Sequence, residues 1–224
     1  MIAVAAVVAW HRHRIQWPSQ APWLALPDLK GKPGVLARLL SDAQDIAKSS
    51  PHPIESVAEL GLLYQANGYG AQAEACWRWL REQQPNNAHW CYYLAELRRA
   101  ASDYPAMVAL LRQTTELAPD YAPAWLKLAE WELKTGQTDA AARDYRRRIV
   151  LLPNDPYAFL GLARVARQNG QNDEARQLVG QLVRDHPDLP SAHNLYAEML
   201  AAEGDETAAL RERQRCRTAG RFRE

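Results

Sequence analysis

The chain has 224 residues, of which 47% are hydrophobic and 24% are charged, and its formal net charge is +1. That composition is typical of a globular protein and excludes a disordered chain. A nearly neutral chain has no global field that would attract nucleic acid or an acidic membrane. Its three cysteines are widely spaced and form no CxxC pair or c-type haem attachment motif, so disulfides are not its main source of stability.

An apolar run, MIAVAAVVAW, occupies residues 1–10 and is followed by the basic HRHR. As a helix it would be ~15 Å long, about half of the hydrocarbon thickness that a spanning helix must cross. Aromatic and basic residues after an apolar run are typical of the interfacial end of a membrane helix. We therefore expect residues 1–14 to be a truncated membrane anchor or signal remnant, with membrane contact through residues 1–23. The alternative is a loose apolar end that packs on the domain that follows. The chain is thus expected to be membrane-associated or soluble, on an undetermined side of the membrane.

A linker and then a short helix are expected before the main domain. Residues 15–34 contain four prolines and two glycines, which predicts an extended linker. Apolar residues then recur at helical spacing. They are Leu36, Leu39, Leu40, Ala43 and Ala47. We expect residues 35–53 to form an amphipathic helix that caps the domain.

A step of 34 residues relates several columns of the remaining sequence. One column of small residues reads Gly61, Ala95, Ala129, Ala163 and Ala197. A second reads Ala73, Met107, Ala141, Ala175 and Ala209. Turn residues recur as Gly68, Ser102, Gly136, Gly170 and Gly204, and prolines as Pro85, Pro119, Pro153 and Pro187. Because independent columns keep one period over five copies, the chain contains an internal repeat.

Each repeated unit is predicted to be a helical hairpin, with short turns within and between hairpins. Gly136 suits the left-handed residue that closes a helix. Asp155 is expected to be an N-cap, and Pro156 to lie in the first turn of the next helix. Small residues at Gly61 and Ala73 indicate that the two helices of a hairpin approach closely there.

This pattern resembles the tetratricopeptide repeat family. The matching residues of the first unit are Leu60, Gly61, Tyr64, Ala73, Trp77 and Pro85. Those of the third unit are Trp125, Leu128, Ala129, Ala141, Tyr145 and Pro153. The resemblance covers about residues 54–223 and implies an all-α fold, a right-handed α-solenoid of stacked helix–turn–helix hairpins. Departures are Met107, Leu80 and Arg148 at usually small positions, and a fifth unit that lacks its proline and ends in a charged helix.

The implied domain, residues 54–224, divides into five repeats. Their bounds are 54–87, 88–121, 122–155, 156–189 and 190–224. The likeness is to bacterial membrane-linked scaffold and assembly proteins of this family. It implies a non-catalytic interaction module, meaning a scaffold, assembly factor or accessory subunit that binds another protein or a peptide.

The sequence contains no catalytic or cofactor-binding motif: no phosphate loop, GxSxG, HExxH or dinucleotide fingerprint. We therefore expect neither an enzyme nor a cofactor. His11 and His13 are two residues apart, and a solvated basic turn is favoured over a metal site there. Cys76 and Cys91 stand in helix-packing registers and are expected to be small buried hydrophobes.

The resemblance also implies a concave groove lined by the first helix of each hairpin. The expected partner-binding residues are Tyr92, Glu96, Arg99, Leu126, Glu130, Lys134, Tyr157, Leu160, Arg164, Arg167, Gln168, Asn194 and Glu198. Arginine can grip a carboxylate with two parallel hydrogen bonds, so we expect a peptide or helix with an acidic element. The family's Lys/Asn clamp for a C-terminal carboxylate is not expected, because Ala58 and Leu62 stand at those positions.

Two arginine-rich stretches suggest an alternative function. RDYRRR lies on the second helix of unit three, and RERQRCRTAGRFRE ends the chain. Either could bind phosphate, so the alternative is binding of anionic lipid or nucleic acid through the C-terminal helix. No stacking aromatics are interleaved with either stretch, so nucleic acid is disfavoured and a solvated outer face and cap are the simpler reading.

Overall fold

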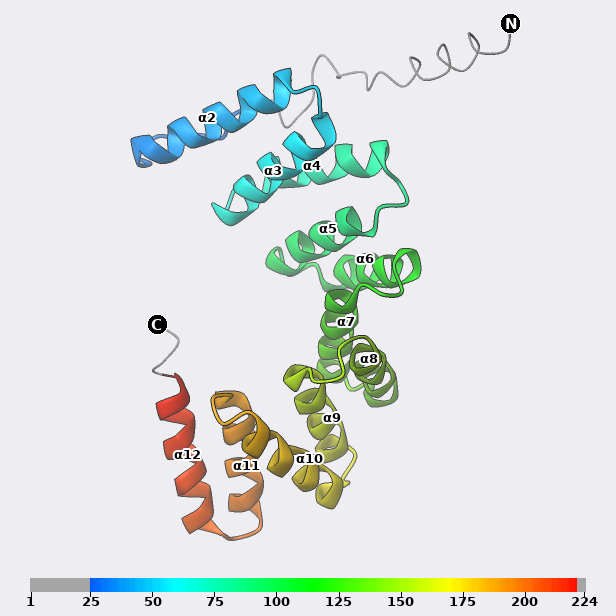
Figure 1. Ribbon diagram of the computed structural model, residues 1–224, viewed down its shortest axis with the longest axis vertical. Coiled ribbons are helices and arrows are strands. Elements are labelled where there is room, and N and C mark those ends of the chain that lie inside the picture. Colours follow the sequence, from blue (N-terminus) through cyan, green and yellow to red (C-terminus); the bar gives the residue numbers. More distant parts are fainter. Residues whose placement is uncertain (1–24, 221–224) are drawn as a thin grey trace, which may run out of the picture. The chain divides into compact units, whose positions relative to one another are not determined.

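The computed structural model describes residues 25–220. Within that part, the chain forms eleven helices and no strand. The predicted all-α fold, a right-handed α-solenoid of helix–turn–helix hairpins, is confirmed (Figure 1). The predictions for residues 1–14 and for membrane contact through residues 1–23 fall outside the described residues. No helix that the structure describes combines the length and the apolarity that crossing a membrane requires.

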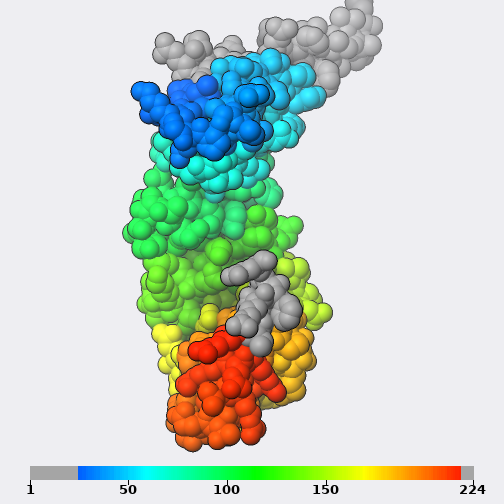
Figure 2. Space-filling view, turned by 90° about the vertical axis from the view of Figure 1, so that its left-hand side faces the viewer, coloured from blue at the N-terminus to red at the C-terminus, as the bar shows by residue number. Residues whose placement is uncertain are grey.

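The chain divides into two compact units, Met1–Leu117 and Ala118–Glu224. The helices of the first unit are α2 (Gly34–Ser49), α3 (Pro53–Ala66), α4 (Gly70–Gln83), α5 (Ala88–Ala100) and α6 (Tyr104–Leu117). Those of the second are α7 (Ala122–Lys134), α8 (Thr138–Leu151), α9 (Pro156–Gln168), α10 (Asn172–Asp185), α11 (Pro190–Ala202) and α12 (Glu206–Gly220). In each unit, a helix packs mainly against its neighbours in the chain, as nearest-neighbour stacking requires. Within each unit, Figure 2 shows this stacking as successive bands of colour.

The turn inside each hairpin contains one residue in the left-handed region. Gly136 has a φ of +79°, which confirms the prediction that it closes its helix. Ser102 occupies the same position in the second repeat with a φ of +60°, and it is the only non-glycine residue of the described chain with a positive φ. The 34-residue period therefore imposes the turn geometry even where glycine is absent.

The core of unit 1 is organised around Trp77 of α4. Its ring is fully buried and stacks on Tyr93 at a centroid distance of 4.6 Å. A Cβ atom at Gly61 would lie 2.8 Å from the ring of Trp77. Ala73 is fully buried as expected, but the side chain that requires a glycine at position 61 is this tryptophan.

One buried ion pair and one buried hydrogen bond between a histidine and a carboxylate join successive elements of unit 2. Arg148 Nε lies 2.6 Å from Asp155 Oδ2, and both side chains are largely buried. Asp155 Oδ1 also accepts a hydrogen bond from the Tyr157 amide, which confirms the predicted N-cap of α9. His193 Nδ1 of α11 lies 2.6 Å from Glu212 Oε2 of α12, with both residues buried.

The expectation of a fully solvated RDYRRR face is therefore wrong at Arg148. Its guanidinium turns toward Asp155, at a position where the family usually has a small residue. Arg143 and Arg146 of the same stretch are exposed, as expected.

Candidate functional site

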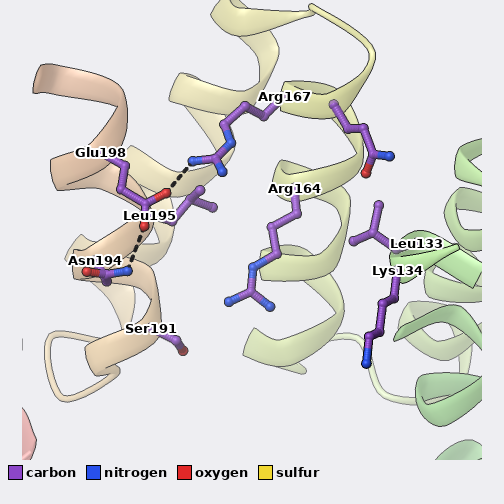
Figure 3. A pocket seen from close by; sticks show the side chains of 9 residues that line it. Leu133, Lys134, Arg164, Arg167, Ser191, Asn194, Leu195 and Glu198 are labelled. Carbon is purple, nitrogen blue, oxygen red and sulfur yellow. Dashed lines mark hydrogen bonds and ion pairs between the residues drawn. The ribbon is translucent and has the colours of Figure 1, made fainter. Parts of the chain in front are cut away.

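A pocket of about 560 Å³ lies in unit 2, between α11 and the end of α7, with α9 between them (Figure 3). It is lined by Leu133, Lys134, Arg164, Arg167, Gln168, Ser191, Asn194, Leu195 and Glu198. These residues come from α7, α9 and α11, the first helices of repeats three, four and five. Three lining side chains are basic and one is acidic, so the pocket carries an excess of positive charge.

One side of the pocket is held by a hydrogen-bonded set across α9 and α11. Arg167 Nη1 donates to Glu198 Oε2 at 2.6 Å, and Asn194 Nδ2 donates to Glu198 Oε1 at 2.8 Å (Figure 3). Both partners of the ion pair are nearly half exposed, at 43% and 48%. Solvent screening therefore limits the stability that the pair contributes, but it fixes where the Arg167 guanidinium lies.

Arg164 is at the centre of the pocket, one helical turn before Arg167 on α9. Its guanidinium points into the open space between α11 and Lys134 (Figure 3). It makes no hydrogen bond or ion pair with another residue of the described chain. Its charge does act on Tyr145: burial raises the pKa of that phenol, the Glu130 carboxylate raises it further, and Arg164 lowers it.

Lys134 completes the basic lining from α7. Its Nζ lies 5.2 Å from the centre of the Trp131 ring, in a cation–π contact. The basic side chains of the pocket therefore differ in their contacts. Arg167 pairs with the Glu198 carboxylate and Lys134 contacts the Trp131 ring, whereas Arg164 has no carboxylate partner within residues 25–220. An anionic group of a ligand would find its ion-pair partner in Arg164.

Six of the residues predicted for the groove line this pocket. They are Lys134, Arg164, Arg167, Gln168, Asn194 and Glu198. Tyr157 is 43% exposed, and Glu130 is exposed beside Lys127, but neither lines the pocket. Leu126 packs partly buried against the core of repeat three.

Leu160, which was also predicted to contact a partner, lies in the core of the structure, and its role in binding stays a prediction. Only 3% of this residue is exposed, because its side chain packs in a core formed by α9, α10 and α11. The remaining predicted residues, Tyr92, Glu96 and Arg99, lie on α5 of unit 1. There Arg99 pairs with Glu96 at 3.0 Å, and Tyr92 packs edge-on against Tyr93. Their role in binding stays a prediction.

Sequence reasoning missed three lining residues, Leu133, Ser191 and Leu195. Ser191 lies three positions before Asn194, so helical spacing alone could have found it. Leu133 and Leu195 read as core residues in sequence, and only the packing shows that each also borders the pocket.

The described residues also bear on the other kinds of site that the sequence suggested. Within residues 25–220 no group of three or more His, Cys, Asp or Glu side chains could hold a metal ion. Cys76 and Cys91 are fully buried, as expected, and burial raises the pKa of the Cys76 thiol to about 12. His11 and His13 lie outside the described residues. Arginines 211, 213 and 217 of α12 are exposed, and their binding of lipid or nucleic acid stays a prediction.

The chain is similar to several known proteins. It is 29% identical over 162 residues to the cellulose synthase 1 operon protein C of Komagataeibacter xylinus, a match that covers 66% of this chain but only 12% of the relative. A tetratricopeptide repeat protein from Parabacteroides merdae superposes with a TM-score of 0.71 at 14% identity, over 83% of this chain and 74% of that one.

A further solved structure, the tetratricopeptide repeat protein YrrB, superposes with a TM-score of 0.64 at 14% identity, over 80% of this chain and 93% of that one. That protein is described as having an unusual peptide-binding site. At such identities these structures show the fold alone. A family model described as tetratricopeptide repeat matches residues 50–220 of this chain. With its hairpin geometry and its 34-residue period, the chain belongs to the tetratricopeptide repeat family.

Proposed function

We propose that this chain is a non-catalytic interaction module that holds an acidic segment of a partner protein in the pocket of unit 2. Arg164 is the anchor of that segment, and Lys134 and Arg167 flank it. The observation that carries the proposal is the Arg164 guanidinium, which points into the pocket and has no carboxylate partner within residues 25–220. An arginine binds a carboxylate through charge-assisted hydrogen bonds with fixed geometry, which gives the pocket its preference for acidic ligands.

The fold and the comparisons support the same proposal. Tetratricopeptide repeats are interaction modules, and the similar protein YrrB is described as having a peptide-binding site. The K. xylinus relative is named for a cellulose synthase operon. We therefore propose that the partner is a protein component of a membrane-linked polysaccharide synthesis assembly, and that this chain serves there as a scaffold or assembly factor.

The test is a titration of the full chain into a fluorescently labelled peptide that contains four consecutive glutamates. We expect Arg164→Glu to weaken binding at least tenfold, which corresponds to about 1.4 kcal/mol. Arg146→Glu makes the same charge change on the exposed surface of α8, outside the pocket, and should leave the affinity within about twofold. Equal losses in the two variants would show a general charge effect and would contradict a specific site.

Two further titrations define what the pocket recognises. The first compares an amidated peptide with one that has a free C-terminus. If both bind equally tightly, the pocket recognises side-chain carboxylates rather than a chain terminus. Vesicles with anionic headgroups and a single-stranded oligonucleotide test the alternative that α12 binds lipid or nucleic acid. If they bind more tightly than the peptide, and Arg213→Glu abolishes that binding, the pocket proposal is wrong.

A further inference from the structure

A proline precedes the first helix of each repeat in unit 2, and its surroundings differ between the repeats. The three residues are Pro119, Pro153 and Pro187, each three positions before the start of α7, α9 or α11. These first helices begin 34 residues apart, and so do the second helices α8, α10 and α12. Positions one period apart are therefore structurally equivalent in these three repeats.

In repeats three and five, the first helix donates a hydrogen bond to the carbonyl oxygen of this proline. Trp125 Nε1 of α7 donates to Pro119 O at 3.0 Å. His193 Nε2 of α11 lies 3.0 Å from Pro187 O, and the nitrogen is the donor because a carbonyl oxygen only accepts. Each of these side chains is the fourth residue of its helix.

Repeat three has a second donor, which comes from α8. Arg147 Nη2 donates to the same Pro119 oxygen at 2.9 Å. An indole and a guanidinium thus meet at one carbonyl group. The contact shows that an arginine side chain can bind this turn of the repeat next to an aromatic ring.

Repeat four has neither donor, and a pocket of about 370 Å³ is open at its turn. Phe159 is the fourth residue of α9, and its ring carries no polar hydrogen. Gln181 of α10 stands one period after Arg147 and makes no hydrogen bond with the turn. Within residues 25–220, no group donates a hydrogen bond to Pro153 O. We call this site the turn pocket.

The turn pocket combines an apolar wall with an acidic rim. Phe159, Leu178 and Leu182 form the wall, and Pro153 borders it. Asp185, near the end of α10, is the only Asp, Glu, Lys or Arg residue of the lining. Its side chain is exposed and makes no hydrogen bond or ion pair with another residue of the part that the structure describes. A fitting group therefore has an apolar stem and a cationic end with several N–H donors.

We propose that the turn pocket binds an arginine side chain of a partner protein. The methylene stem of that arginine lies on Phe159 and Leu178, and its guanidinium donates to Pro153 O and pairs with Asp185. The contact repeats, between two chains, what Arg147 does within repeat three. A lysine is a poorer occupant, because its ammonium lacks the planar fork that reaches two acceptors in fixed directions.

The turn pocket is a second binding site with the opposite charge preference. It shares no lining residue with the pocket around Arg164, which we propose to bind an acidic segment. One chain can therefore hold an acidic and a basic segment at the same time, as a scaffold between two partners does. The two proposals stand on different residues, so each can fail without the other.

The test is a titration of the full chain into a fluorescently labelled, amidated peptide that contains four consecutive arginines. Phe159→Trp supplies the indole that repeat three has, so the larger ring fills the pocket and donates to Pro153 O. We expect this variant to bind the peptide about tenfold more weakly. Asp185→Asn should weaken binding about three- to fivefold, the loss of one exposed ion pair. Asp173→Asn makes the same change at the other end of α10 and should leave the affinity unchanged.

Circular dichroism checks that Phe159→Trp is folded, so the test does not depend on the pocket around Arg164. A folded Phe159→Trp protein that binds the arginine peptide as tightly as the wild type overturns the proposal. Equal losses in Asp185→Asn and Asp173→Asn also contradict it, because they show attraction to acidic surface in general. So does a peptide of four lysines that binds as tightly as the arginine peptide, since charge alone is then recognised.

Discussion

Two buried glycines of unit 2 show how the same substitution can have opposite effects on stability. A Cβ atom at Gly161 of α9 would lie 2.2 Å from Cζ of Tyr145, whose ring is almost fully buried. At Gly180 of α10 the nearest atoms are 3.7 Å or more away, an ordinary contact. We expect Gly161→Ala to destabilise the protein by about 1–3 kcal/mol through overpacking. Gly180→Ala should stabilise it by about 0.5–1 kcal/mol through helix propensity. Urea denaturation monitored by circular dichroism measures both.

The clash with Tyr145 can be separated from other effects by a second substitution. Tyr145→Leu removes the atoms that the new methyl group would meet, at the cost of some packing. If the clash is the cause, Gly161→Ala should destabilise the Tyr145→Leu protein much less than it destabilises the wild type. An equal loss in both backgrounds would contradict this explanation.

The cysteines should differ sharply in reactivity. Burial raises the pKa of the Cys76 thiol from 9.0 to about 12 and also raises that of Cys91, so neither forms the reactive thiolate at neutral pH. Cys216 of α12 is only partly buried. At pH 8 we expect Ellman's reagent to label Cys216 rapidly and the other two only after addition of urea. Rapid labelling of Cys76 in the native protein would mean that unit 1 opens far more readily than its packing indicates.

The same burial predicts a loss of stability in unit 1 at alkaline pH. Desolvation is the main cause that raises the pKa of Tyr64 from 10.0 to about 12. It also raises the pKa of Cys76 to about 12. The unfolded state therefore loses these protons first, so stability is constant below about pH 9 and falls as the pH rises toward 12. The urea midpoint of unit 1, followed by tryptophan fluorescence, should fall over this range. Tyr64→Phe should make the fall shallower; an unchanged slope would exclude Tyr64 as a cause.

At the scale of the elements, Asp155 links two helices of unit 2. It caps α9 and neutralises Arg148 of α8, whose side chain is only 11% exposed. Asp155→Ala removes both interactions and leaves the guanidinium without its partner. Because breaking a buried pair costs more than losing a cap, we expect a loss of about 2–4 kcal/mol.

A cap without a buried ion pair provides the control. Asn87 caps α5 by accepting a hydrogen bond from the His89 amide, and we expect Asn87→Ala to cost only ~1 kcal/mol. Both values come from urea denaturation at pH 7. If the two substitutions cost the same, the pair of Arg148 and Asp155 contributes nothing beyond the cap.

The 34-residue period explains which parts of this architecture the sequence predicts. It fixes the turns and hairpin registers, because each repeat meets its neighbours in the same way. It also assembles most of the pocket, since Arg164 and Glu198 are one period apart and face the same side. It did not reveal the burial of Leu160 or the ion pair of Arg148, because both depend on side chains that differ between repeats.

At the scale of the whole molecule, the division into two compact units makes the pocket separable. All of its lining residues lie between Leu133 and Glu198, inside Ala118–Glu224. That unit has three hairpins, about the minimum for a stable repeat array, and its last helix is charged on its outer side. We expect residues 118–224 alone to fold and to bind the acidic peptide within about threefold of the full chain. Residues 1–117 should not bind it.

Salt distinguishes the expected binding from nonspecific adhesion in the same fragment. An exposed pocket that recognises carboxylates through arginine should bind the acidic peptide more weakly as salt rises from about 50 to 500 mM, because the Debye length shortens and screening increases. Arg164→Gln should weaken that dependence, because it removes one of the three basic side chains whose attraction salt screens. A folded fragment that binds with salt-independent affinity would show that apolar contacts hold the ligand. A folded fragment without binding would mean that residues of unit 1, such as Tyr92 and Arg99, are needed.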